Sequence, residues 1–257
     1  MFVVDLTFDC YQDTQLSAAE QAINQTVVAL RANGQIIGDE FPTVLKEGFF
    51  VTRVMCPEED SLHPLNHSPF VKFALDKLND AGLLAPKVKV IGQDIHANSA
   101  DNCAAPSSYI LYTTYLHTCS PLYCGDDFLP VPLYHIPAIA NGDYKTLIKW
   151  QEDWQACDQI QINGATRCEF AALHEISAFD SDLTRRGLDL AKRIRYLTKK
   201  PVYYYLYRVG GESLTAEQQR RCPSCDGHWH LAEPWFGLFD FRCEQCQLIS
   251  NISWDHQ

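Results

Sequence analysis

Two pairs of cysteines have the residue type and the spacing of a metal site. Cys222 and Cys225 form one Cys-x-x-Cys pair, Cys243 and Cys246 form a second, and residues 226–242 lie between them. Each pair can present two thiolates from one tight turn, and two such turns complete a tetrahedral set of ligands that suits zinc. Because four protein ligands leave no open coordination position, we expect one structural zinc ion and no catalytic metal.

Two other interpretations of this segment are weaker. A thioredoxin-like redox pair would explain Cys222-Pro-Ser-Cys225, but it requires the N-terminus of a helix in a β-α-β unit and leaves the second pair unexplained. His228 and His230 could compete as ligands, yet four correctly spaced thiolates already complete the tetrahedron. The two histidines are therefore expected to be strand residues of the zinc-binding segment.

The other cysteines do not show such a pattern. The chain has 11 cysteines, and an odd number argues against a disulfide framework. Four residues of the middle region could form a second metal site, but their spacing matches no familiar ligand pattern. These residues are His117, Cys119, Cys124 and His135. Buried thiols and hydrogen-bonded histidines are the favoured interpretation.

No familiar catalytic motif is present. The sequence has no Gly-x-Ser-x-Gly, no phosphate-binding glycine loop and no His-Glu-x-x-His. The paired groups Asp126-Asp127 and His174-Glu175 lack a partner nucleophile or metal, so surface or capping roles are favoured. We expect the protein not to be an enzyme, and an active site in the cysteine- and proline-rich stretch 119–135 is the weaker alternative.

Basic residues gather in one segment of an acidic chain. Residues 184–221 hold ten Lys or Arg and three acids, although the whole chain has a net charge of −11. On a helix predicted over 182–199, cationic residues recur every seven positions, opposite an apolar stripe. The stripe is Leu183, Leu190, Ile194 and Leu197, and the cations predicted to contact phosphates are Arg185, Lys192, Arg193, Arg195 and Lys199. Such a face could hold nucleic acid without reading its sequence, whereas a solvated helix face is the alternative.

The cysteine-rich segment itself cannot bind nucleic acid through charge. Residues 222–257 contain one arginine, Arg242, and five acids. Exposed aromatic rings can stack on the bases of single strands, and Trp229 and Trp235 are the predicted base contacts. A core role is favoured for most aromatic residues of this segment, and docking on a protein partner is a further alternative.

The first 95 residues are predicted to form a ferredoxin-like α+β domain (1–95). Alternating apolar residues predict strands, and apolar residues at helical spacing predict two helices. Strands are expected at 2–8, 35–38, 44–55 and 87–94, with one helix after the first strand and one before the last. This β-α-β-β-α-β order is that of the split β-α-β arrangement, a fold that hosts many unrelated activities.

Capping residues set the expected ends of these two helices. Ser17 and Glu20 can form a capping box at the start of the first helix, which Gly34 ends. Ser68 precedes Pro69 at the start of the second helix, which Ala81-Gly82 ends. The buried stripe of the second helix is expected to be Phe70, Phe73, Ala74 and Leu78.

The rest of the chain divides into an α+β middle domain at 96–208, a linker at 209–221 and a zinc ribbon, a small β domain, at 222–257. In the middle domain we expect strands at 109–116 and 201–208 and helices at 143–154 and 182–199. A ribbon of about 36 residues cannot build a sufficient core alone, and structural zinc can contribute roughly 10 to 16 kcal/mol. Zinc is therefore expected to fold the ribbon.

Composition and charge limit the partners and the location. The net charge of −11 and the pI of ≈ 5.2 repel phosphate backbones and anionic membranes, so nucleic acid could be held only by a local basic patch. No run approaches the roughly 18 to 20 apolar residues of a bilayer span, and residues 1–5 lack the cationic region of a signal peptide. A cytoplasmic protein without a membrane partner is expected.

Several stretches together carry a family resemblance. They are Ser120-Pro-Leu-Tyr-Cys-Gly125, Pro130-Val-Pro-Leu-Tyr134, the block from Asp182 to Lys200-Pro-Val-Tyr-Tyr-Tyr-Leu206, and the two cysteine pairs. The chain resembles the proteobacterial proteins that contain a zinc ribbon and for which nucleic-acid binding is inferred, a family of unknown function. The resemblance spans essentially the full chain and implies a zinc ribbon and a nucleic-acid partner.

These observations predict a cytoplasmic, non-enzymatic zinc-ribbon protein that is associated with nucleic acid. The alternative is a regulatory adaptor whose ribbon docks on a protein partner; in that case the ribbon aromatics would matter and the basic helix face would not. The choice between DNA, RNA and a protein as the partner stays open at this point.

Overall fold

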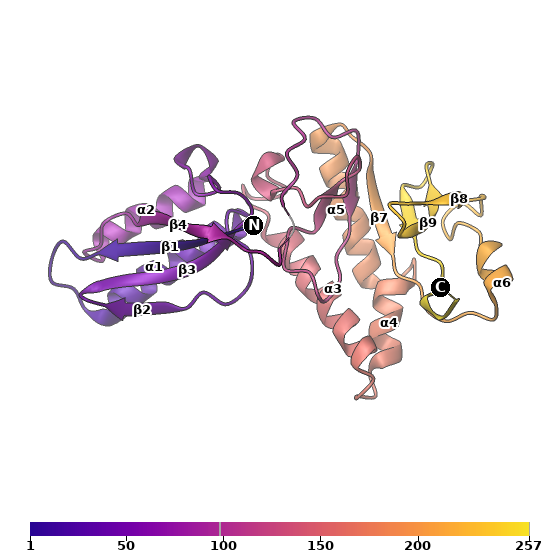
Figure 1. Cartoon of the computed structure of the whole chain (residues 1–257), viewed down its shortest axis with the longest axis horizontal. Coiled ribbons are helices and arrows are strands. Elements are labelled where there is room, and N and C mark those ends of the chain that lie inside the picture. Colours follow the sequence, from indigo (N-terminus) through magenta and orange to yellow (C-terminus); the bar gives the residue numbers. More distant parts are fainter. Residues whose placement is uncertain (98, 257) are drawn as a thin grey trace. The chain divides into compact units, whose positions relative to one another are not determined.

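A computed structural model describes residues 1–97 and 99–256 (Figure 1). It is a mixed α+β structure with two sheets, and its residues divide into two compact units. The first unit comprises residues 1–102, 118–120 and 129–146, and the second comprises 103–117, 121–128 and 147–257. Within the described ranges, no helix is both long enough and apolar enough to cross a bilayer.

The first unit contains a four-stranded antiparallel sheet in the order β2-β3-β1-β4. Its elements are β1 (Phe2–Asp9), α1 (Leu16–Ala32), β2 (Thr43–Lys46), β3 (Phe49–Cys56), a 3-10 turn (Pro64–Asn66), α2 (Pro69–Asp80), β4 (Lys87–Gln93) and a second 3-10 turn (Leu133–His135). Val4, Leu6 and Phe8 alternate along β1 and are buried beneath the two helices, which cover one face of the sheet (Figure 1).

The second and third strands differ from the sequence-based expectation. Residues 35–38 form no strand in the described chain; their only ladder contact is an isolated bridge from Ile37 to Met55. The predicted strand at 44–55 is instead a hairpin, because Glu47 and Gly48 have φ values of 54° and 85°. Positive φ at both central residues is the mark of a two-residue turn that reverses the chain. Strands β2 and β3 therefore come from one predicted strand.

The predicted helix caps are right for three of the four ends. Asn33 is the C-cap of α1, with Gly34 at φ 70°, and the Ser68 hydroxyl accepts a hydrogen bond from the Val71 N–H at 3.3 Å. Ala81 is the C-cap of α2. The capping box at Ser17 is wrong, because α1 begins one residue earlier with Gln15 as a backbone N-cap.

The predicted buried stripe of α2 needs correction. Val71, Ala74 and Leu78 form the buried face, which places them three and four residues apart along the helix. Phe70 and Phe73 lie outside that face, and Phe73 is 62% exposed. The prediction chose the two large phenylalanines for the buried stripe, whereas the smaller Val71 is the buried residue.

A segment of the predicted middle domain, residues 129–146, belongs to the first unit. Glu58 Oε2 accepts a hydrogen bond from the Tyr134 hydroxyl at 2.5 Å and lies 2.9 Å from His135 Nε2. This pairing raises the pKa of His135 above its usual value of 6.5. Burial would raise the pKa of Glu58, but the hydrogen bonds from His135 and Tyr134 outweigh it and hold that pKa below 4.5.

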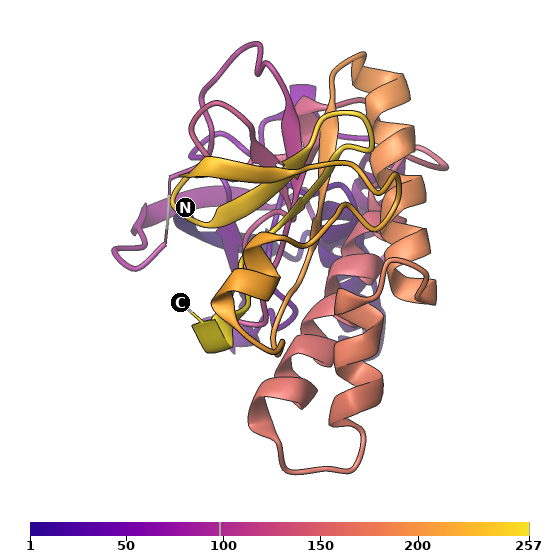
Figure 2. The ribbon, with the colours of Figure 1, turned by 90° about the vertical axis from the view of Figure 1, so that its right-hand side faces the viewer.

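The second unit contains a six-stranded sheet in the order β6-β5-β7-β10-β9-β8. Its elements are β5 (Tyr109–Leu111), β6 (Leu122–Cys124), α3 (Lys145–Asn163), α4 (Glu169–Ser177), α5 (Asp182–Thr198), β7 (Val202–Leu206), α6 (Leu214–Gln218), β8 (His230–Trp235), β9 (Phe239–Cys243), β10 (Leu248–Ser250) and a 3-10 turn (Trp254–His256). Strand β7 is parallel to both of its neighbours, β5 and β10. Figure 2 looks onto this unit, with the β8–β9 hairpin in yellow and α5 in orange.

The C-terminal strands share the sheet of the middle region. Leu248, Ile249 and Ser250 of β10 pair with Tyr204, Tyr205 and Leu206 of β7. The segments predicted at 96–208 and 222–257 therefore contribute strands to one sheet. All five side chains of β7 are buried, as is typical of a parallel strand that is covered on both faces of its sheet.

The helices and strands of the second unit follow the sequence approximately. The strand expected at 109–116 ends at Leu111, and the helix expected at 143–154 continues to Asn163. Helix α5 begins after the N-cap Ser181, whose hydroxyl accepts from the Thr184 N–H at 3.1 Å. Helix α4 lies in a stretch for which no helix is predicted.

Candidate metal centre and the adjoining basic face

The four cysteine sulfurs lie together at one end of the six-stranded sheet. Cys222 and Cys225 come from the turn that precedes β8, Cys243 ends β9, and Cys246 lies in the turn that leads into β10. All four Sγ atoms are within 4.8 Å of one another. The hairpin β8–β9 thus brings two turns that are far apart in sequence to one point.

The spacing of the sulfurs fits a shared metal ion and not a disulfide. Cys225 Sγ and Cys243 Sγ are 3.7 Å apart. A tetrahedral zinc ion at about 2.3 Å from each sulfur would separate the sulfurs by about 3.8 Å, whereas a disulfide requires about 2.05 Å. The donor set of four thiolates is the one that structural zinc prefers.

The two cysteine turns have the same local conformation. Asp226 follows the first pair and Gln247 follows the second, and both have φ of 54°. The Gly227 N–H donates a hydrogen bond to Cys225 Sγ and lowers the pKa of that thiol, while the Cys246 N–H donates to Cys243 Sγ. A Cβ atom on Gly227 would lie 3.2 Å from Cys225 Sγ, so this position favours glycine. Each turn therefore points backbone donors at sulfur, as a thiolate requires.

The alternative interpretations of this segment do not match their surroundings. His228 and His230 are both exposed, and neither belongs to the group of sulfurs. In the described structure Cys222 and Cys225 follow α6 and precede β8, so the pair does not begin a helix as a thioredoxin-like pair would.

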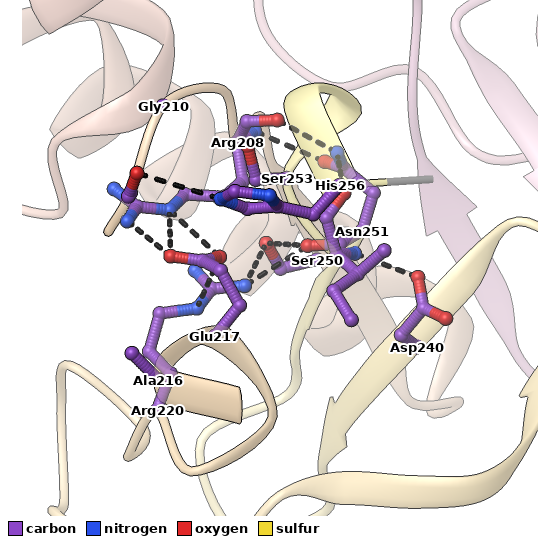
Figure 3. A network of polar contacts seen from close by, with 12 residues as sticks. Arg208, Gly210, Ala216, Glu217, Arg220, Asp240, Ser250, Asn251, Ser253 and His256 are labelled. Atoms are coloured by element: carbon purple, nitrogen blue, oxygen red, sulfur yellow. Dashed lines mark hydrogen bonds and ion pairs between the residues drawn. The ribbon is translucent and has the colours of Figure 1, made fainter. Parts of the chain in front are cut away.

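A buried polar network fixes the segment that precedes the first cysteine turn (Figure 3). The carboxylate of Glu217 on α6 is 3% exposed and accepts hydrogen bonds from Arg208, which follows β7. Burial would raise the pKa of Glu217, but the bonds and charge of Arg208 hold it below its usual value of 4.5. The predicted linker at 209–221 therefore contains a helix and a buried ion pair.

Arg220 connects this network to the ribbon core. Its guanidinium lies 3.7 Å from Glu217 Oε2 and donates to the carbonyl oxygen of Asn251 at 2.9 Å. The same guanidinium lies over the rings of Trp229 and Phe241, at 5.2 and 4.3 Å from the ring centroids. Burial lowers the pKa of Arg220 to about 10. Sequence reasoning missed Arg208, Glu217 and Arg220; the N-cap Ser213, four residues before Glu217, was the available signal.

Half of the six ribbon aromatics are core residues. Trp229, Phe239 and Phe241 are buried, whereas Trp235 and Phe236 are half-buried and Trp254 is 41% exposed, so the favoured core role is right for three of the six. Trp229 is 2% exposed and its Nε1 donates to the Arg220 carbonyl at 2.9 Å, so its ring has no free face for a base. Trp235 is half-buried beneath the Arg242 guanidinium, which lies 4.2 Å from the ring centroid.

All five predicted phosphate-contacting cations of α5 are exposed, but their surroundings differ. Arg185 pairs with Asp182 at 3.3 Å, and Lys192 pairs with Asp189 at 3.1 Å. Near the end of the helix Arg195 donates to the neutral Oε1 of Gln247 at 2.8 Å. Gln247 directly follows Cys246, so the C-terminal half of the basic face adjoins the second cysteine turn.

The C-terminal half of α5 also carries an exposed tyrosine. The Tyr196 ring is 64% exposed and has cations over it, with Lys199 Nζ at 4.1 Å and the Arg193 guanidinium at 5.7 Å from the centroid. Sequence reasoning named the cations and missed the ring. We define Arg193, Arg195, Tyr196 and Lys199 as the basic-aromatic patch.

The remaining candidate residues either form hydrogen bonds that support the fold or do not gather into one site. Asp126 accepts from the Ser107 N–H at 2.8 Å, and Glu175 accepts from the Leu183 N–H at 2.9 Å at the start of α5. Among residues 1–97 and 99–256, no group with ligand spacing brings together the four residues considered for a second metal site, His117, Cys119, Cys124 and His135.

The fold and the site define an α+β protein with a cluster of four cysteines. Three family models match, each described as a domain of unknown function: DUF8589 at 1–92, DUF2310 at 103–207 and DUF8594 at 211–256. A Haemophilus influenzae protein described as an uncharacterized protein is 42% identical over 249 residues, which cover 95% of this chain and 94% of that protein. The chain belongs to the family of that protein, a family of unknown function.

Two further similarities were found. A second uncharacterized protein of Haemophilus influenzae is 44% identical over 176 residues, which cover 68% of this chain and 85% of that protein. A Deinococcus radiodurans crystal structure described as a "putative antibiotic biosynthesis monooxygenase" aligns over 39% of this chain and all of its own, with 16% identity and a TM-score of 0.28. A TM-score of that size carries no argument about fold or activity.

Proposed function

We propose that this chain is a zinc-ribbon protein that associates with nucleic acid, with a structural zinc ion bound by Cys222, Cys225, Cys243 and Cys246. The 3.7 Å separation of two sulfurs and the backbone N–H groups directed at them support zinc as the bound ion. Bound there, zinc would cross-link the two turns and hold the β8–β9 hairpin against β10 without taking part in a reaction. This proposed function is not catalytic.

The observation that carries the nucleic-acid proposal is the basic-aromatic patch beside the second cysteine turn. Cations can neutralise phosphates, and an exposed ring such as Tyr196 can stack on a base of a single strand. Arg195 contacts Gln247, so folding of the zinc turn fixes one edge of the patch. We therefore assign the predicted phosphate contacts mainly to Arg193, Arg195 and Lys199 and replace Trp229 with Tyr196 as the base contact.

We further propose a ferredoxin-like assignment for the first unit and a cytoplasmic location for the protein. The sheet order β2-β3-β1-β4, with a helix after β1 and another before β4, supports the ferredoxin-like assignment. Eleven cysteines without a disulfide support a reducing compartment.

Fluorescence anisotropy with the zinc-loaded protein tests the proposal. Labelled single-stranded RNA, single-stranded DNA and duplex DNA are titrated at about 50 and 200 mM salt, a range over which phosphate-led binding weakens strongly. We expect single strands to bind more tightly than the duplex, with an affinity that falls steeply as salt rises. Arg195→Glu/Lys199→Glu should abolish binding, and Tyr196→Ala should weaken it about tenfold, in line with roughly 1 to 3 kcal/mol per stacked base.

Matched variants separate the patch from general charge. Arg167→Glu/Lys149→Glu changes two exposed cations elsewhere in the second unit by the same charge and should leave binding unchanged. Equal losses in the two double variants would contradict the patch. Absence of binding to all three nucleic acids would instead favour the alternative function, a ribbon that docks on a protein partner.

A further inference from the structure

The first unit contains a cavity of ≈ 530 Å³ that the proposed function does not use. One wall is a single face of α1, and the other is formed by alternate residues of the extended stretch 39–45. Ile23 and Val27 from α1 and Phe50 from β3 form its buried floor. The volume lies within the range of about 300 to 1,000 Å³ that is typical of small-molecule sites.

The cavity is open because the helix does not cover the edge strand. Leu45 of β2 pairs with Phe50 of β3, and the two side chains point to the same face of the sheet. Phe50 is buried, yet Leu45 is 63% exposed, as is Leu16 at the opposite rim on α1. All four residues of β2 are exposed. The mouth therefore has two apolar side chains that face solvent.

The charges at the cavity are all of one sign. Glu20 from α1 and Asp39 from the opposite wall are the charged side chains of its lining, and no Lys, Arg or His contributes. Within the described residues, neither carboxylate forms an ion pair. The lining also offers two aromatic rings, Phe41 and Phe50, whose faces attract cations. A cleft with an apolar floor and two carboxylates that form no ion pair is complementary to a molecule with an apolar body and a positive charge.

We propose that this cavity is a binding site for an amphiphilic organic cation, an ammonium group attached to an apolar chain or ring. The apolar part would lie on Ile23, Val27 and Phe50, and the ammonium group would lie between Glu20 and Asp39. The site is formed by the first unit alone, so it is independent of the zinc ribbon and of nucleic-acid binding.

Binding of three probes that share one apolar chain tests the proposal. Octylammonium, octanol and octanoate are titrated into the full chain by isothermal calorimetry, and the contacted residues are mapped by backbone amide shifts. We expect octylammonium to bind at least about fivefold more tightly than octanol, since each exposed ion pair contributes roughly 0.2 to 1 kcal/mol. Octanoate should not bind, and the shifted amides should lie in α1 and at 39–50.

Variants distinguish the carboxylates from the overall negative charge. Glu20→Gln/Asp39→Asn should reduce octylammonium affinity to that of octanol, while Asp13→Asn/Asp76→Asn, with the same change in charge outside the cavity, should leave the preference intact. Leu45→Trp should fill the mouth and weaken both ligands. Equal affinity for octanoate, equal effects of the two double variants, shifts outside α1 and 39–50, or no binding of octylammonium would each overturn the proposal.

Discussion

Cys225 is one of the two half-buried ligands of the proposed zinc centre, so its replacement by serine puts no new polar group into the buried core. We expect the wild type to bind one zinc ion and Cys225→Ser to bind none and to unfold the β8–β9 hairpin, because a hydroxyl is a poor substitute for a thiolate. Zinc measured by inductively coupled plasma mass spectrometry and amide spectra of 222–250 would report the two effects.

A cysteine outside the centre provides the control for that experiment. Cys157 on α3 is half-buried and lies outside the sulfur group, so Cys157→Ser should retain its zinc. A chelator should reproduce the spectrum of Cys225→Ser when it is added to the wild type. Full zinc content in Cys225→Ser would exclude the four-thiolate site.

His135 provides a pH test at the same scale. Glu58 raises the pKa of His135, so this group stabilises the fold in full below about pH 6.5 and loses that contribution as pH rises through its folded pKa. Glu58 has a lowered pKa, so its contribution is present above pH 4.5 and is lost as pH falls through the lower folded value. The contact between Glu58 and His135 is therefore strongest between these two limits.

Titration of the imidazole proton signals by NMR measures this effect directly. His135 should titrate above 6.5 in the wild type and nearer to 6.5 in Glu58→Gln. His67 and His117 should titrate below 6.5 in both proteins, because burial lowers their pKa values. A His135 pKa that is the same in Glu58→Gln as in the wild type would exclude the contact.

At the scale of elements, the short helix α6 depends on one buried carboxylate. Glu217→Ala would leave the buried Arg220 without its counter-charge, and loss of one partner of a buried pair costs about 3 to 5 kcal/mol. We expect the free energy of unfolding in urea to fall by about 3 kcal/mol. Glu212→Ala, at an exposed position in the same loop, should change it by less than about 0.5 kcal/mol. Equal effects of the two substitutions would contradict the role of Glu217.

Sequence reasoning succeeded where the physical signal is local. The Cys-x-x-Cys pairs, the Ser68 cap and the Gly34 stop are each defined within a few residues, and the structure has them as predicted. Errors arose where contacts between residues that are distant in the sequence determine the structure. Residues 209–221 have the composition of a linker, and only contact with Arg208 and Asn251 makes α6 part of the core. The bound nucleic acid and the metal stay predictions.

Sheet order was the least accessible feature at the element scale. Strand β7 lies between β5 and β10, and each pairing depends on residues far away in the sequence. The hairpin at Glu47-Gly48 was also missed, although a residue followed by glycine is a turn signal. The strand-like residues of 43–46 and 49–56 on the two sides of that turn hid it.

At the scale of the whole molecule, the proposed acidic site and the proposed basic site belong to different units. The N-terminal cavity presents only carboxylates, whereas the basic-aromatic patch belongs to the second unit. An acidic chain can bind a polyanion in this way only through a local patch, so the salt dependence of its binding should follow the number of phosphates that the patch neutralises and not the net charge of the chain.

The parallel pairing of β7 with β10 also affects how the protein is made. A ribosome releases β7 before it has synthesised residues 248–250, so the nascent sheet has one open edge along five apolar or aromatic residues. Both cysteine turns are synthesised after β7 and before β10. Zinc bound at the proposed centre would therefore help to set β10 against β7 and close an edge that could otherwise pair with a second nascent chain.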